Sequence, residues 1–127
     1  MKKQLISLSL AAALILPGMA MADKFVEGFQ AAEEHEYKQA MKQWESIAKK
    51  GDPKAMFMLG MMYHSGIAGQ PDEKTAVVLY KKAAEAGNLV AQEYLAVGYK
   101  EGWFGLKKDS KKASYWEKKV KEAGDLR

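Results

Sequence analysis

Apolar residues recur along the chain with the spacing of one helix face, in segments separated by polar residues and glycines. In the clearest segment, Ala55 is followed by apolar residues at i+4, i+7 and i+8: Leu59, Met62 and Tyr63. This spacing places the four side chains on one side of an α-helix. A second segment carries the same kind of stripe, formed by Ala76, Leu79, Tyr80, Ala83 and Ala84. The pattern therefore predicts an all-α chain.

Short polar residues and glycines mark where the predicted helices begin and end. Four side chains that can accept hydrogen bonds from unpaired backbone amides precede the stripes: Asp52, Asp72, Asn88 and Asp109. Pro53 strengthens the first of these starts, because proline at the first helical position has no amide to leave unpaired. Glycine adopts the left-handed conformation without steric cost, so we expect helices to end at Gly66 and Gly87.

The helical pattern repeats with a period of about 36 residues. Residues 55–66 return as residues 91–102, with alanine, leucine, tyrosine and glycine at matching places. Residues 76–87 have an earlier copy at 40–51 and a later one at 113–124, which comes one residue further on because the preceding loop is longer. A helix pair that repeats in this way cannot bury its apolar stripe alone. The units are therefore expected to stack into a linear array.

Three such units of two helices each are predicted, over residues 23–51, 52–87 and 88–124. The first pair is expected at 24–34 and 36–50, with a turn at His35. Small residues such as Gly60 and Ala96 are expected to let neighbouring helix axes approach closely. Three units is about the minimum for a stable array of this kind.

The repeated residues resemble Sel1-like repeats, which are relatives of tetratricopeptide repeats. The resemblance rests on Ala-x3-Leu-Gly-x2-Tyr-x2-Gly at residues 55–66 and Asp-x3-Ala…Lys-Ala-Ala-x2-Gly at residues 72–87. It extends over essentially all of residues 23–127. The third unit departs from the pattern, because Ala96 replaces glycine and Trp103-Phe104-Gly105 lengthens the loop. The resemblance implies an α/α solenoid of about three helix-turn-helix repeats, in a family whose members usually act as adaptors in protein–protein contact.

The N-terminus carries the three parts of a secretory signal peptide in order. Lys2 and Lys3 are positive, an apolar run spans residues 5–16, and Ala20 and Ala22 stand at −3 and −1 of a cleavage site. A membrane anchor is the alternative, but a span needs about 20 apolar residues and this run is shorter. Residues 1–22 are therefore predicted to be removed after Ala22, leaving residues 23–127 in the periplasm or secreted.

Composition and motifs argue against several classes of chemistry. The chain has no cysteine, which excludes thiolate zinc sites and cysteine nucleophiles. A formal charge of +4 is too small to indicate nucleic-acid binding. No phosphate-binding loop, metal-binding helix motif or serine elbow is present. We therefore expect no cofactor, no metal ion and no catalytic residue, and we do not expect His64 to be catalytic. The expected partner is a protein.

An alternative function comes from the resemblance. One cysteine-rich branch of the family is associated with β-lactam binding and hydrolysis, which implies a cell-wall-related hydrolase or ligand-binding protein. The absence of cysteine removes the disulfide scaffold of that branch, so its activity is not carried over to this chain. An enzyme would need two titratable groups with shifted pKa values to converge in a cleft.

The partner is expected to bind in the groove that the first helix of each unit lines, by analogy with tetratricopeptide geometry. The helix face opposite the packing stripe selects the residues of this groove: Phe57, Met61, His64, Val97 and Lys100. Exposed apolar patches of this kind usually mark contact surfaces. Phe57 and Met61 would supply apolar contact, while His64 and Lys100 would add polar anchoring.

Two features near the C-terminus have more than one interpretation. The lysines of residues 107–121 form either a solvated outer face or a surface for an anionic partner. Trp103 and Phe104 either cover the gap between the last two helices or form an exposed aromatic anchor. A homodimer through the open C-terminal end is a further alternative. Terminal repeats normally need a polar outer face, and an end without one would pair with a second copy or a partner.

Overall fold

The computed structural model describes residues 17–125 of the chain. Most of the predicted signal peptide therefore lies outside the described residues. Within this range the chain is all-helical and forms six helices: α1 (Pro17–Glu33), α2 (Tyr37–Ala48), α3 (Pro53–Ser65), α4 (Glu73–Glu85), α5 (Leu89–Glu101) and α6 (Ser110–Asp125). Among the described helices, none has the length and apolar character that crossing a membrane requires.

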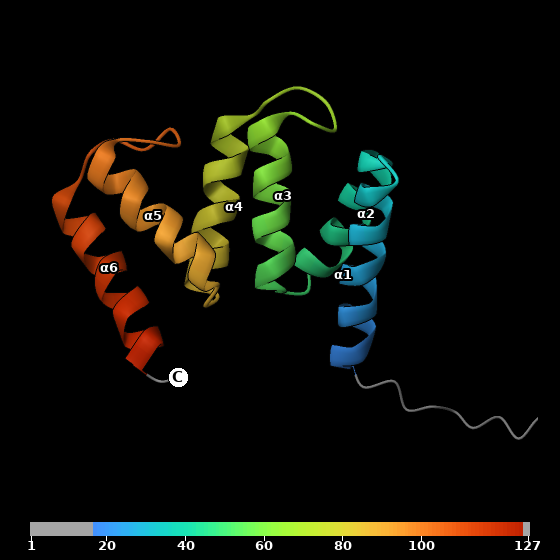
Figure 1. Ribbon diagram of the computed structural model, residues 1–127, viewed down its shortest axis with the longest axis horizontal. Coiled ribbons are helices and arrows are strands. Elements are labelled where there is room, and N and C mark those ends of the chain that lie inside the picture. The colour runs from blue at the N-terminus through green and yellow to red at the C-terminus, as the bar shows by residue number, and fades with distance from the viewer. Residues whose placement is uncertain (1–16, 126–127) are drawn as a thin grey trace, which may run out of the picture.

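The six helices form three pairs that follow one another along the long axis of the molecule (Figure 1). The two helices of each pair, α1 with α2, α3 with α4 and α5 with α6, pack most extensively against each other. Each pair then contacts the next one through α2 with α3 and α4 with α5. This nearest-neighbour arrangement is the architecture of an α/α solenoid, and it confirms the predicted fold class.

The helix starts and stops that the capping residues predict are also confirmed. The side chains of Asp52, Asp72 and Asn88 each accept a hydrogen bond from the amide three residues further on, at 2.8–3.0 Å. Asp72 also accepts a hydrogen bond from the Thr75 hydroxyl, which lowers the pKa of its carboxyl group. At the other end of α3, Gly66 has a φ of 69° and its amide donates to the carbonyl of Met62. Such left-handed caps satisfy carbonyls that the helix itself leaves unpaired.

The first pair differs from its prediction at the start of α1. This helix begins at Pro17, seven residues before the expected start at residue 24. Proline is tolerated in the first turn of a helix, because the amide that it lacks has no partner there. The turn after α1 falls at His35, as predicted, and this residue has a positive φ of 63°.

The core consists of two apolar clusters that meet at the middle pair. One contains buried residues of α1, α2 and α3: Ala31, Ala40, Trp44, Ile47, Ala55, Leu59 and Met62. The other contains buried residues of α4, α5, α6 and the last loop: Ala76, Tyr80, Ala83, Ala84, Ala91, Leu95, Ala96, Tyr99, Leu106, Ala113 and Trp116. Helix α3 contributes to the first cluster and packs against the second through Met56, Phe57 and Tyr63. The middle pair therefore joins the two halves of the protein.

A glycine packed against a large ring sets the close approach of the helices in the first two pairs. A β-carbon at Gly28 would lie 2.5 Å from Nε1 of Trp44, and one at Gly60 would lie 2.6 Å from Cε1 of Tyr80. Real β-carbon contacts essentially never fall below 3.0 Å, so neither ring leaves room for a side chain. This contact confirms the expected role of Gly60 and identifies Gly28 as its counterpart in the first pair.

Candidate functional site

Three large apolar side chains are exposed at equivalent places on the first helices of the three pairs. Phe29, Met61 and Val97 are 46%, 40% and 40% exposed. Each directly follows the small residue at the equivalent place of its helix: Gly28, Gly60 or Ala96. Because equivalent positions of stacked repeats lie on the same side of the array, these residues define one surface. We call it the first-helix face, and Phe29, Met61 and Val97 the apolar row.

A small aromatic pocket opens on this face between α3, α5 and the last loop, which joins α5 to α6. Its volume is about 210 Å³, and six residues line it: Met61, His64, Ser65, Tyr80, Tyr94 and Phe104. The rings of Tyr94 and Phe104 are stacked, with their centroids 4.9 Å apart. His64 and Tyr80 close the ring of contacts, since His64 lies 5.8 Å from Phe104 and Tyr80 lies 5.4 Å from Tyr94. Four rings from four segments of the chain therefore surround one opening.

A hydrogen bond between Tyr80 and His64 anchors the buried side of this pocket. The Tyr80 hydroxyl lies 3.3 Å from Nδ1 of His64, and the tyrosine side chain is 2% exposed. Burial raises the pKa of Tyr80 well above its ordinary value, and the neighbouring Tyr94 adds to the shift. The tyrosine is therefore neutral at physiological pH. Its hydrogen bond with His64 gives a partner to a hydroxyl group that would be costly to bury without one.

The raised pKa of Tyr80 predicts how stability depends on pH in the alkaline range. Above a pH of about 10 an unfolded chain releases the tyrosine proton, whereas the folded protein still holds it. The contribution of Tyr80 to stability is therefore fully present below that pH and is lost as the pH rises further. We expect the free energy of unfolding in urea to fall as the pH rises above about 10, and to fall less in Tyr80→Phe. Parallel curves for the two proteins would contradict the assignment.

The longer loop of the third unit completes the pocket and divides the roles of its two aromatic residues. Phe104 has a positive φ of 57°, a conformation that a bulky residue adopts only when its surroundings hold it there. Stacking on Tyr94 and contact with His64 provide that support. Trp103 is instead 56% exposed beside the pocket. Phe104 therefore packs against α3 and α5, through His64 and Tyr94, while Trp103 remains at the surface.

The five residues expected in the groove are brought together only in part. Met61 and His64 line the aromatic pocket, and Val97 lies in the apolar row of α5. Phe57 is half-buried, and its ring centre lies 5.6 Å from that of Tyr80 and 5.4 Å from that of Tyr94, so it packs against two rings that line the pocket. Lys100 lies toward α6, where its Nζ is 3.6 Å from Oε1 of Glu117.

The sequence did not assign Phe29, Tyr80 or Tyr94 to this surface, and it left the role of Phe104 open. The signal for Phe29 was present, because it follows Gly28 as Met61 follows Gly60. The first unit is divergent, however, and its register becomes evident only when Gly28 is seen against Trp44. Tyr94 and Phe104 meet through the last loop, whose path no periodic pattern specifies.

The described residues offer no catalytic constellation around His64. Its Nδ1 pairs with the Tyr80 hydroxyl, and no carboxylate is hydrogen-bonded to it within residues 17–125. A histidine that acts as a general base needs a nucleophile within reach and a group that orients the ring. In the same range, no three histidine or acidic side chains gather as metal ligands would. This geometry gives the hydrolase alternative no support at His64.

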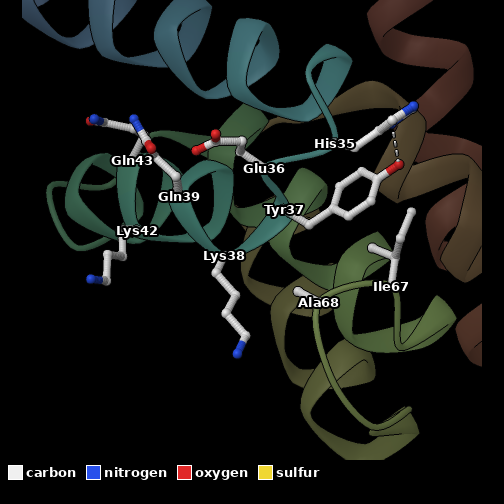
Figure 2. Close-up of a pocket in the computed structure, with 9 residues that line it drawn as sticks. All are labelled: His35, Glu36, Tyr37, Lys38, Gln39, Lys42, Gln43, Ile67 and Ala68. Carbon is white, nitrogen blue, oxygen red and sulfur yellow. Dashed lines mark hydrogen bonds between the residues drawn. The ribbon is translucent and has the colours of Figure 1, made fainter.

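A surface depression of about 740 Å³ lies between the start of α2 and the α3–α4 loop. His35 and Tyr37 are hydrogen-bonded there at 2.9 Å and approach Ile67 of the loop (Figure 2). Figure 2 shows that Lys38 and Lys42 point away from this contact. A binding site needs polar groups that converge on one ligand, so this depression is not a candidate site.

Part of the lysine-rich C-terminal surface is engaged within the protein. Lys118 and Lys119 each lie 3.9 Å from the Glu122 carboxylate, and the ammonium of Lys112 lies 5.3 Å from the centre of the Tyr99 ring. Exposed pairs of this kind contribute little to stability. Binding of an anionic partner here and a homodimer through this end both stay predictions.

The fold and this surface define a short repeat protein of the α/α solenoid class with an exposed apolar row along its first helices. The sequence model of the Sel1 repeat matches residues 53–88 and 89–125, more than half of the chain. The chain therefore belongs to the Sel1 repeat family, as the sequence analysis predicted.

Solved structures agree with this assignment. A Sel1 repeat protein from Oxalobacter formigenes is 30% identical with a TM-score of 0.72, over 81% of this chain and 44% of that one. A protective antigen present in uropathogenic Escherichia coli strains, which displays an SLR fold, is 29% identical with a TM-score of 0.64, over 84% and 24%. The chain thus spans less than half the length of either protein. Comparison with curated proteins gave no match.

Proposed function

We propose that this protein is an exported interaction module of the bacterial envelope, which binds a segment of a protein partner on its first-helix face. The observation that carries the proposal is the apolar row, in which Phe29, Met61 and Val97 are all at least 40% exposed. Exposed apolar side chains that are aligned rather than scattered usually mark a contact surface. Export is supported by the signal-like pattern of residues 1–22.

The aromatic pocket adds specificity to this surface. Energy in protein interfaces concentrates in a few well-packed pockets, and aromatic residues are prominent among those that supply it. The pocket lies next to Met61 of the row and has the exposed ring of Trp103 at its side. A partner that lies along the row would therefore place one side chain in the pocket.

The proposal is tested by cross-linking the tagged full chain in intact cells and recovering its partner from the envelope fraction. The double variant Met61→Ser/Val97→Ser removes two members of the row, which are exposed and can become polar without opening the core. We expect recovery of one protein to fall about tenfold, because each lost apolar contact weakens the complex several-fold. Phe57→Ala is unsuitable as a test, because this half-buried ring supports Tyr80 and Tyr94.

The matched control is Val78→Ser/Tyr115→Ser, which changes two exposed residues on the second helices α4 and α6. It should recover the same partner in the amount found with the unaltered chain. If both double variants recover the partner equally, the first-helix face is not the binding surface. If neither variant nor the unaltered chain recovers a specific protein, the interaction function itself is refuted.

A further inference from the structure

We infer that the partner segment is basic, and that the aromatic pocket receives one of its lysine or arginine side chains. The inference rests on the function proposed above and adds the chemistry of the partner to it. Two independent features of the first-helix face carry it: carboxylates placed along the apolar row, and the concentration of aromatic rings in the pocket.

Carboxylates flank the row at both ends. On α5 the exposed residues Val90, Glu93, Val97 and Glu101 follow one another at spacings of three and four, so they lie on one side of the helix. Val97 thus stands between two carboxylates one turn away. On α1, Glu33 is exposed four residues after Phe29, the place that Glu101 has after Val97.

The first-helix face carries fewer positive side chains than negative ones. Lys54, at the start of α3, shares the side of the helix that carries Met61. The ammonium of Lys100 already lies 3.6 Å from the Glu117 carboxylate of α6. Three carboxylates along the row therefore outweigh Lys54 and Lys100, of which the second is already paired. An acidic partner would meet like charges there, and a basic partner would meet complementary ones.

The pocket itself favours a cation. The face of an aromatic ring attracts a lysine or guanidinium group within about 6 Å of its centre, more strongly where water is partly excluded. Tyr94, Phe104 and Tyr80 bring three such rings to the wall of a space of about 210 Å³, which is the size of one side chain. Met61 and Phe104 offer apolar surface for the methylene stem of a lysine or arginine, whose charged head can stay near the rim.

The opposite charge lies elsewhere on the molecule. Seven lysines gather on α6 and the loop before it: Lys107, Lys108, Lys111, Lys112, Lys118, Lys119 and Lys121. A partner segment that carries positive charge is therefore repelled from α6 and steered toward the first-helix face. Charge separation of this kind selects the orientation and the identity of a partner more than it adds affinity.

The experiment uses a phage library of random 12-residue peptides, selected on the immobilised full chain. We expect the enriched peptides to combine apolar residues with lysine or arginine. The most enriched peptide is then labelled, and its affinity is measured by fluorescence anisotropy against the unaltered protein and its variants. Glu93→Gln/Glu101→Gln should weaken it about fivefold, the effect of two exposed charge pairs, and should reduce its salt dependence. Tyr94→Leu should weaken it about threefold, because it removes a ring face but keeps an apolar side chain.

The matched control is Glu45→Gln/Glu85→Gln, which removes the same charge from the second helices α2 and α4 and should leave the affinity unchanged. Glu93 and Glu101 are exposed, so their variant tests the inference even if Tyr94→Leu does not fold. Unchanged affinity in Glu93→Gln/Glu101→Gln overturns the inference. Enriched peptides that are acidic or uncharged, yet lose binding to Met61→Ser/Val97→Ser, also overturn it and leave the proposed function standing. Peptides that bind this variant undiminished, or no enrichment at all, refute both.

Discussion

Replacing Trp44 with alanine is expected to lower the free energy of unfolding by about 4 kcal/mol, the usual effect of removing a large buried ring. Trp44 is 2% exposed, and its ring lies 6.1 Å from those of both Phe25 and Phe29. Its indole Nε1 also donates a hydrogen bond to the carbonyl of Phe25 at 3.1 Å. The variant loses both this packing and this hydrogen bond.

Urea denaturation measures the loss, and hydrogen exchange locates it. Because the core is divided into two clusters, exchange should rise most in α1 and α2 and least in α5 and α6. Trp103→Ala is the matched control, since it makes the same substitution at an exposed ring and should change stability by less than about 0.5 kcal/mol. Equal losses from the two variants would refute the packing described for the first pair.

Replacing Gly60 with valine is expected to destabilise the protein by about 3 kcal/mol, at the upper end of the range for overpacked cores. The new β-carbon would lie 2.6 Å from Cε1 of Tyr80, whose ring is buried and cannot swing into solvent. The ring also lines the aromatic pocket, so the same variant should weaken binding of a partner there. Thermal or urea unfolding gives the first effect, and peptide affinity gives the second.

Gly124→Val on α6 is the control, because a β-carbon there meets no atom within 4 Å. It should leave stability within about 0.5 kcal/mol of the unaltered chain. The contact with Tyr80 is then isolated by the double variant Gly60→Val/Tyr80→Leu. Residues in direct contact have non-additive effects, so the double variant should lose less stability than the two single variants together. Strict additivity would show that the valine clashes elsewhere.

The close packing of glycine against a ring also relates stability to the candidate site. Gly60 draws α3 and α4 together around Tyr80, and the hydroxyl of this tyrosine reaches His64 at the pocket. Gly60 and Tyr80 of the core are thus in direct contact with the residues that form the pocket. We therefore expect changes to Tyr80 to affect both stability and binding, whereas changes to Val97 affect binding alone.

Helix positions and caps could be predicted from the sequence because their causes are local. Asp52 caps α3 through an amide three residues away, and Gly66 ends the same helix through its own backbone conformation. The predicted start of α1 was wrong, and the reason is local as well. Proline disrupts the interior of a helix but is tolerated in the first turn, where Pro17 lies. Residues beyond the nearest turn have no part in these choices.

The sequence by itself determined that the chain is a stack of helix pairs with a period of about 36 residues, and it selected Met61 and Val97 for one face. Periodicity states which side of a helix a residue occupies, and equivalent positions of a repeat share a side. Only the tertiary structure decided that Phe29 continues the row, that Phe104 closes the pocket on Tyr94, and that Lys100 pairs with Glu117 instead. These contacts depend on the path of one irregular loop and on the distances between helix axes, which are set by packing across the whole array.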